Sequence, residues 1–545
     1  YATIFALSES PLVRGQIWAG SDDGMIHLTR NGGATWTDVS PKGYGDWLRI
    51  SSIDASRYAA GTVYVAANRY QMDDMRPYLL KSTDYGKTWT LITTGLPSTE
   101  FTRVLREDPV RRGLLYAGTE RGVWVSFDDG GHWQSLQRNL PIVPVHDLAV
   151  KDNDLVVATH GRAFWILDDV TPLRQMSSAV ASAPAHLFTP AVAYRVSWSA
   201  GFDPGDAAAH PSGKNPPSGV YIYYSLAHAN QDVALEIRDA KGALIRHLTS
   251  RLDSIGLVDS LHADSVKAAF RDSLHRVAAP GDTSWKTASP PTAEVSGEDA
   301  PRRPPRPQRV PNHQGLNVLV WDMRYPDASW FTNLIMWAGS VRGPLAPPGN
   351  YTVTLLVGDT KETKPFVLKK DPRSPATQAD LDQQFALLIK IRDTLTAAND
   401  AVKTIRNVRW QINDRMSSAP DEFKKAAPAV LDTLGAIEAQ IYQVKNRSGQ
   451  DPLNYPIRLN NKIAALSGTV ASADRRPTQP SYAVYRKLSA QLAKQLTALD
   501  AVLRTELPKL NAPLKAAGQP VIVPKPVEVE PAKPLVGDDE ETEER

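Results

Sequence analysis

An eight-residue pattern occurs three times near the start of the chain and limits what that part can fold into. Each copy reads Ser or Thr, any residue, Asp or Asn, any residue, Gly, two more residues and Trp; the copies are 29–36, 82–89 and 126–133. The Asp or Asn side chain can accept hydrogen bonds from backbone amides just downstream, and the Gly can adopt a positive φ. The Trp is expected to pack as an apolar anchor at the start of the next strand. The pattern therefore predicts a hairpin turn between two strands.

A short apolar strand precedes each copy of the turn, so the repeating unit is larger than the turn. A fourth such strand, 154–159, is followed by a second strand at 163–169 that lacks the Gly–Trp part. The tryptophans of the three complete copies are 53 and 44 residues apart, a period that fits propeller blades of about four strands. We predict four blades within residues 1–175, at 1–40, 47–97, 100–140 and 142–175.

The turn pattern resembles the Asp-box, or BNR repeat, of sialidases, xyloglucanases and sortilin/VPS10 propellers. The segment from Asp154 to Arg174 is most similar to the closing blade of bacterial sortilin-like BNR proteins, in which a β-sandwich and a helical region follow the propeller. The resemblance implies a secreted, periplasmic or cell-surface protein. Two features depart from it: the chain has no cysteine, unlike the cysteine-rich module of animal sortilins, and it lacks the early-blade arginine motif of sialidases.

Four blades close a propeller only rarely, and six to ten are usual in the families that the turn resembles. An open propeller exposes a strand edge that invites pairing with another chain. We therefore expect N-terminal blades to be missing from this chain, or another polypeptide to close the propeller.

The loop after the second strand of each blade should emerge on one face, opposite the repeated turns. We expect a ligand to bind at this mouth through the loops' charged and aromatic residues: Asp22, Asp23, Arg69, Tyr70, Asp73, Asp74, Arg76, Glu120, Arg121, His160 and Arg162. The ligand would be a peptide, a protein or a glycan. The alternative is that these are solvated loop charges that pair with one another.

Glycoside hydrolysis is the enzymatic alternative, because it needs two carboxyl groups across a sugar, and Asp22, Asp73 and Glu120 are candidates. No pairing of a nucleophile with a base is evident, so the first hypothesis is a sortilin-like binding and scaffold protein. A structural subunit of a larger surface assembly is the second alternative. Without cysteines or a histidine pair at ligand spacing, we predict no metal site and no cofactor.

Charge and hydropathy exclude two kinds of partner. The net charge of +3 is too small to argue for nucleic acid or a membrane surface. No apolar run approaches the roughly 18 residues that a membrane span requires.

The fold class expected for the whole chain is multidomain: an incomplete propeller, a β-sandwich and a helical bundle. Residues 185–372 alternate like an immunoglobulin-like sandwich, similar to FlgD-type domains, with an insertion at 251–314. Within this insertion we expect a short helix at 266–277. The basic proline-rich run at 301–307 is either a binding segment for an acidic or SH3-like partner or an extended strap.

Residues 377–510 change to a helical period and predict a bundle, with an oligomeric coiled coil as the alternative. Thr377 and Asp380 should cap its first helix, and Pro508 should end its last. The tail at 520–545 is proline-rich, then acidic, and should be poorly ordered unless it docks.

Overall fold

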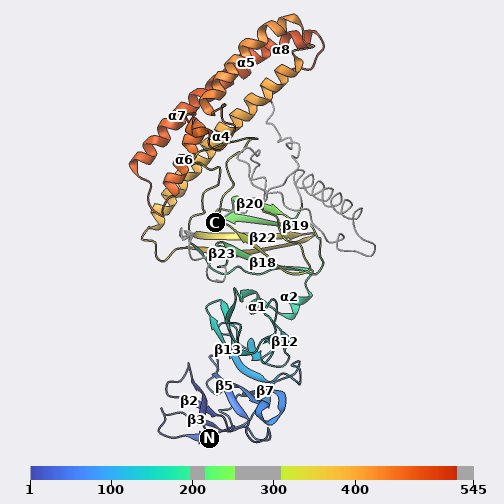
Figure 1. Ribbon diagram of the computed structural model, residues 1–545, viewed down its shortest axis with the longest axis vertical. Coiled ribbons are helices and arrows are strands. Elements are labelled where there is room, and N and C mark those ends of the chain that lie inside the picture. Colours follow the sequence, from blue (N-terminus) through green and yellow to red (C-terminus); the bar gives the residue numbers. More distant parts are fainter. Residues whose placement is uncertain (1, 197–214, 252–307, 525–545) are drawn as a thin grey trace, which may run out of the picture. The chain divides into compact units, whose positions relative to one another are not determined.

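The computed structural model describes residues 2–196, 215–251 and 308–524 (Figure 1). The helix expected at 266–277, the proline-rich run at 301–307 and the acidic part of the tail lie outside these residues. The chain divides into two compact units, Tyr1–Pro184 and Ala185–Arg545. No helix in the described ranges is both long and apolar enough to cross a membrane.

The first unit consists of four antiparallel sheets in which strands follow one another in chain order. The sheets are β1 (Ile4–Glu9), β2 (Ile17–Ser21), β3 (Ile26–Thr29) and β4 (Thr37–Asp38); β5 (Arg49–Ala55), β6 (Val63–Arg69), β7 (Asp74–Ser82) and β8 (Thr90–Leu91); β9 (Thr102–Glu107), β10 (Leu115–Thr119), β11 (Val123–Ser126) and β12 (Gln134–Ser135); and β13 (Val145–Lys151), β14 (Asp154–Thr159) and β15 (Phe164–Leu167). Consecutive sheets share apolar cores. The unit is propeller-like, and its fourth sheet has three strands, at the repeat that lacks the Gly–Trp sequence.

The three repeated turns form the same two hydrogen bonds, of which the one to the Asp or Asn side chain was predicted. In the third copy, Gly130 N donates to Ser126 Oγ (3.0 Å) and His132 N donates to Asp128 Oδ1 (2.8 Å). The first and second copies repeat both bonds at 2.9–3.0 Å. The turns are therefore closed by their own side chains.

The repeat tryptophans join neighbouring sheets. Trp89 Nε1 donates to Val39 O of the first sheet (2.8 Å), and Trp133 Nε1 donates to Ile92 O of the second (2.7 Å). Trp36 is 44% exposed, so the predicted anchor role is wrong for the first copy. The physical reason is that no preceding sheet in the described residues covers it.

The β-sandwich of the second unit has two sheets around one core that includes Trp321. Pairing sets the strand order β16-β18-β21 in one sheet and β17-β23-β22-β19-β20 in the other. The strands are β16 (Ala185–Leu187), β17 (Ala193–Arg195), β18 (Val220–Leu226), β19 (Val233–Asp239), β20 (Leu244–Thr249), β21 (Gly315–Trp321), β22 (Gly349–Val357) and β23 (Thr360–Lys370).

A helical region follows the sandwich and packs around one apolar core. Its helices are α4 (Gln378–Arg415), α5 (Asp421–Ile441), α6 (Leu459–Ala471), α7 (Gln479–Ala501) and α8 (Leu507–Ala516). Thr377 and Asp380 form the predicted capping box of α4. The prediction that Pro508 ends the last helix is wrong. A π-helical turn, Val502–Glu506, precedes α8, and Pro508 lies in the first turn of α8, where its missing N–H costs little.

The start of the tail is docked on the helices. Ile522 is buried, its amide donates to Asn511 Oδ1 (2.8 Å) and its carbonyl accepts from Asn511 Nδ2 (2.9 Å). Gln411 Nε2 donates to Val523 O (2.8 Å). Side chains of α4 and α8 therefore hold this segment in place.

Candidate functional site

The first strand of each sheet carries an irregularity at the same place. One residue has no partner on the neighbouring strand: Phe5 in β1, Ser51 in β5, Arg103 in β9 and His146 in β13. Such β-bulges redirect side chains and are common beside binding sites. Four bulges in equivalent positions place these four side chains in one row across the sheets.

The predicted ligand loops lie at the same end of the sheets as the bulges. Asp22 N donates to Thr3 O (3.0 Å), and Glu120 N donates to Phe101 O (3.1 Å). Both of these loops therefore contact the residue directly before the first strand of their own sheet. The repeated turns pair instead with the opposite hairpins, as when Asp129 N donates to Gly113 O (2.9 Å). We call the end with the bulges and these loops the loop face.

Asp74 is the centre of the loop face on the second sheet. Its carboxylate accepts from Arg76 Nε (2.9 Å) and a second guanidinium nitrogen of Arg76 (2.9 Å), from Arg69 (3.2 Å) and from the hydroxyl of Tyr78 (2.6 Å). The hydrogen bonds of Arg76, in particular, hold the pKa of Asp74 well below its usual range. Three of the predicted site residues are therefore ion-paired, and together they keep one positive charge.

The third sheet repeats this pairing. Glu120 forms an ion pair with Arg103 (2.6 Å), and Arg121 lies 3.7 Å from Glu100. The Tyr70 ring stacks on the Phe101 ring, with centroids 4.7 Å apart, and the Arg103 guanidinium lies 4.9 Å from the Phe101 centroid. The faces of these rings are thus already in contact with protein groups.

The remaining aspartates of the predicted site are held locally or lie alone. Asp22 Oδ1 accepts from Thr3 N (2.9 Å), and Asp23 accepts from the Ser21 hydroxyl. Asp73 ends a 3-10 turn with φ 59°, a conformation that Asp tolerates. Asp22 and Asp23 therefore belong to the loop of the first sheet, and Asp73 belongs to that of the second.

The fourth loop contributes His160 and Arg162. His160 N donates to Pro144 O (2.9 Å), and its ring lies 5.0 Å from that of His146. The Arg162 side chain is exposed, and its carbonyl accepts from Trp165 Nε1 (3.0 Å).

Four residues of the loop face were missed by the sequence analysis: Phe5, Arg49, Arg103 and His146. The Arg49 guanidinium lies 3.8 Å from the centroid of the Phe5 ring and forms no ion pair with any residue that the structure describes. Burial, followed by the nearby charges of Arg103 and His160, lowers the pKa of His146. The sequence does offer one way to find Phe5, Arg103 and His146, which is that they occupy equivalent positions in the first strands of three repeats.

The three candidate catalytic carboxylates lie in three different loops, β2–β3, β6–β7 and β10–β11. Asp22 accepts a hydrogen bond from Thr3, and Glu120 pairs with Arg103. Within residues 2–196, 215–251 and 308–524, no group of three or more acidic, His or Cys side chains could hold a metal ion.

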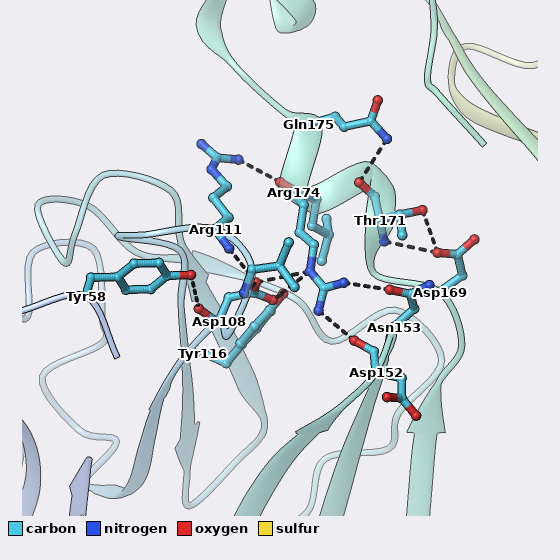
Figure 2. Close-up of polar contacts among 12 residues, drawn as sticks. Tyr58, Asp108, Arg111, Tyr116, Asp152, Asn153, Asp169, Thr171, Arg174 and Gln175 are labelled. Atoms are coloured by element: carbon cyan, nitrogen blue, oxygen red, sulfur yellow. Dashed lines mark hydrogen bonds and ion pairs between the residues drawn. The ribbon is translucent and has the colours of Figure 1, made fainter. Parts of the chain in front are cut away.

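A second polar cluster, at the other end of the sheets, is structural (Figure 2). Both carboxylate oxygens of Asp108 lie 3.0 Å from Arg174 Nε, and both side chains are buried. Arg174 also donates to Asn153 Oδ1 (2.7 Å) and to Asp152 O (2.9 Å). The cluster attaches α1 (Thr171–Gln175) to the third and fourth sheets.

Comparisons with known proteins give distant likenesses only. No protein-family profile matches the chain, and no curated protein matches it. Among solved structures, YCF48 from Cyanidioschyzon merolae is 16% identical over 31% of this chain and 54% of its own, with a TM-score of 0.24, so the chain spans about half of that protein. A GH74 enzyme of Niastella koreensis is 14% identical over 45% of this chain and 36% of its own (TM-score 0.25).

A third match is PorZ, described as an essential surface component of the type-IX secretion system of Porphyromonas gingivalis. It is 11% identical over 67% of this chain and 44% of its own, with a TM-score of 0.25. TM-scores this low assign neither fold nor function by themselves. The propeller-like character of the chain is evident from its own four sheets.

Proposed function

We propose that this is a sortilin-like binding and scaffold protein, secreted, periplasmic or at the cell surface, that recognises a peptide, protein or glycan at the loop face. The observation that carries the proposal is the division of charge on that face. Its central carboxylates, Asp74 and Glu120, are neutralised by arginines, whereas Arg49 has no acidic partner among the described residues. Arg49 therefore favours an anionic segment of the ligand, and the nearby imidazole rings of His146 and His160 can add hydrogen bonds to it.

The glycoside hydrolase alternative receives no support from the geometry. General acid and base must face each other across a sugar, and Glu120, one of the three candidates, is already paired with Arg103. The sugar-release test uses a panel of polysaccharides and sialosides, with the Asp22/Asp73/Glu120 triple-alanine variant as control. We expect no release. Release by the wild type, but not by the folded triple variant, would make the protein a glycosidase.

A larger assembly is favoured by a separate observation, which is that the first and last sheets each leave one face uncovered. Leu7 of β1 is 67% exposed and Phe164 of β15 is 75% exposed, whereas β6 is buried over all but its last residue. We propose that further blades cover these two faces, contributed by the same polypeptide or by another that closes the propeller.

The binding proposal is tested with a fluorescent glutamate-rich peptide and a heparin-derived oligosaccharide as anionic probes. Anisotropy should report binding that weakens with salt, and Arg49→Gln combined with His146→Gln should weaken it at least about tenfold. Arg112→Gln is the matched control, because Arg112 is an exposed arginine in the hairpin between β9 and β10 at the opposite end of the sheet. Equal loss in both variants, or no binding of either probe, would contradict an anion-selective loop face.

A further inference from the structure

A cleft of about 740 Å³ opens in the second unit, between the β-sandwich and the first turns of α4. Its sandwich wall includes Asp239, Lys241 and Tyr325, and its helix wall includes Asp382 and Phe385. Contacts between the walls fix its shape: Gln378 Nε2 donates to Pro348 O (2.9 Å). This site is independent of the loop face, which belongs to the other unit.

The apolar part of the cleft is a partly exposed aromatic pair. The Tyr325 and Phe385 rings lie 4.7 Å apart at 57°, and Pro347 and Pro348 line the same cleft. Burial raises the pKa of Tyr325 to about 12, with a smaller contribution from the charge of Asp239. The Tyr325 hydroxyl is therefore neutral at physiological pH, and no described residue hydrogen-bonds it.

The charged groups of the cleft nearly balance. The two acids are Asp239 and Asp382, and the lysines are Lys241, Lys369 and Lys370. Lys370 is committed to the protein, since its Nζ donates to the carbonyls of residues 374 and 376 at 2.8 and 2.7 Å. Its ammonium charge remains, so the three lysines and two aspartates of the lining sum to a net charge of only +1.

Both the acidic and the basic side chains of the cleft can hydrogen-bond to a ligand. Asp239 Oδ1 accepts from two amides of its own hairpin, at 2.9 Å each, and Asp382 Oδ1 accepts from Gln378. Each carboxylate keeps a second oxygen. The side chains of Lys241, Lys369 and Asn350 have no hydrogen-bond partner within the described part of the chain.

A ligand hydroxyl suits this arrangement because it donates to a carboxylate and accepts from an ammonium or amide group. A strongly charged ligand would need a large excess of one sign, whereas the lining has an excess of a single positive charge. The aromatic pair can contact the C–H face of a sugar ring, and the volume lies within the roughly 300–1,000 Å³ of small-molecule sites. We propose that this cleft binds a neutral oligosaccharide.

The test is calorimetric titration of the full chain with cello-, xylo-, manno- and maltohexaose. At least one neutral hexaose should bind, and Asp382→Ala and Tyr325→Ala should each weaken it at least about tenfold. Asp382 is exposed on α4, so its variant keeps the test valid if Tyr325→Ala fails to fold. Asp432→Ala, an exposed acid on α5 outside the cleft, is the matched control and should bind as the wild type does.

Three results would overturn the proposal. The first is that no neutral hexaose binds up to millimolar concentration. The second is that the binding is unchanged in both cleft variants or equally lost in the control. The third is that only charged probes bind, either oligogalacturonate or a synthetic peptide with the basic proline-rich sequence of residues 301–307.

Discussion

Two aspartates of the first unit show how burial determines how much an arginine partner contributes to stability. Asp74 and Asp108 each accept bonds from arginine, but the Arg76 partner of Asp74 is 65% exposed, whereas the Arg174 partner of Asp108 is 7% exposed. Water screens the first pair and is excluded from the second. The two sites should therefore respond differently to substitution.

Asp74→Asn should lower the free energy of unfolding at pH 7 by only about 1 kcal/mol, because solvent screens the pair. The pKa of Asp74 is lowered in the folded state, so its stabilisation is present above the unfolded pKa of 3.8 and is lost as pH falls through the folded value. The difference between wild type and variant in urea unfolding should thus narrow below about pH 4. Asp73→Asn is the control, and a constant difference across pH would contradict the ion-pair assignment.

Arg174→Ala should cost about 3–5 kcal/mol, because it leaves Asp108 buried without its counter-charge. Arg121→Ala, whose side chain is 58% exposed beside Glu100, should cost less than about 1 kcal/mol. Urea unfolding followed by tryptophan fluorescence measures both. Adding Asp108→Asn to Arg174→Ala should recover part of the loss, and failure to do so would mean that lost packing, not the orphaned charge, is the cause.

At the scale of the element, the repeat joins each sheet to the one before it. Trp133 is 5% exposed and bonded to Ile92 O, so Trp133→Ala should cost about 3–5 kcal/mol. Trp36 occupies the same position in the first copy but is 44% exposed, and Trp36→Ala should change stability by less than about 0.5 kcal/mol. Equal melting temperatures for the two variants would contradict the role of the tryptophan between sheets.

Sequence reasoning succeeded where the determinants are local. The turn bonds of residues 126–133 and the capping box at Thr377 need only neighbouring residues, and both were predicted. The bulges at Arg103 and His146 depend on how one strand pairs with the next, which periodicity does not reveal. The prediction for Pro508 failed for a related reason. A proline ends a helix where its missing N–H removes a backbone hydrogen bond. Here a π-helical turn precedes Pro508, which lies in the first turn of α8, where that N–H is not needed. The ligand role of the loop face stays a prediction.

At the scale of the whole molecule, the exposed apolar face of the fourth sheet predicts self-association. Phe164 and Ile166 are 75% and 58% exposed on one face of β15, and a sheet face of this kind is an interaction surface. The isolated chain should therefore self-associate as its concentration rises, measured by light scattering on size-exclusion chromatography. Phe164→Glu with Ile166→Glu should reduce the association, because each places a charge where an apolar contact would form.

Ile142→Glu is the matched control for that pair. Ile142 is 71% exposed, but it lies in the loop before β13 and not on the face that a further blade would cover. Its substitution should leave self-association unchanged, since exposure alone is not what the assembly uses. A wild type that stays monomeric at high concentration would count against an open propeller. Equal loss of association in the control would show that general apolar exposure, and not the sheet face, drives the contact.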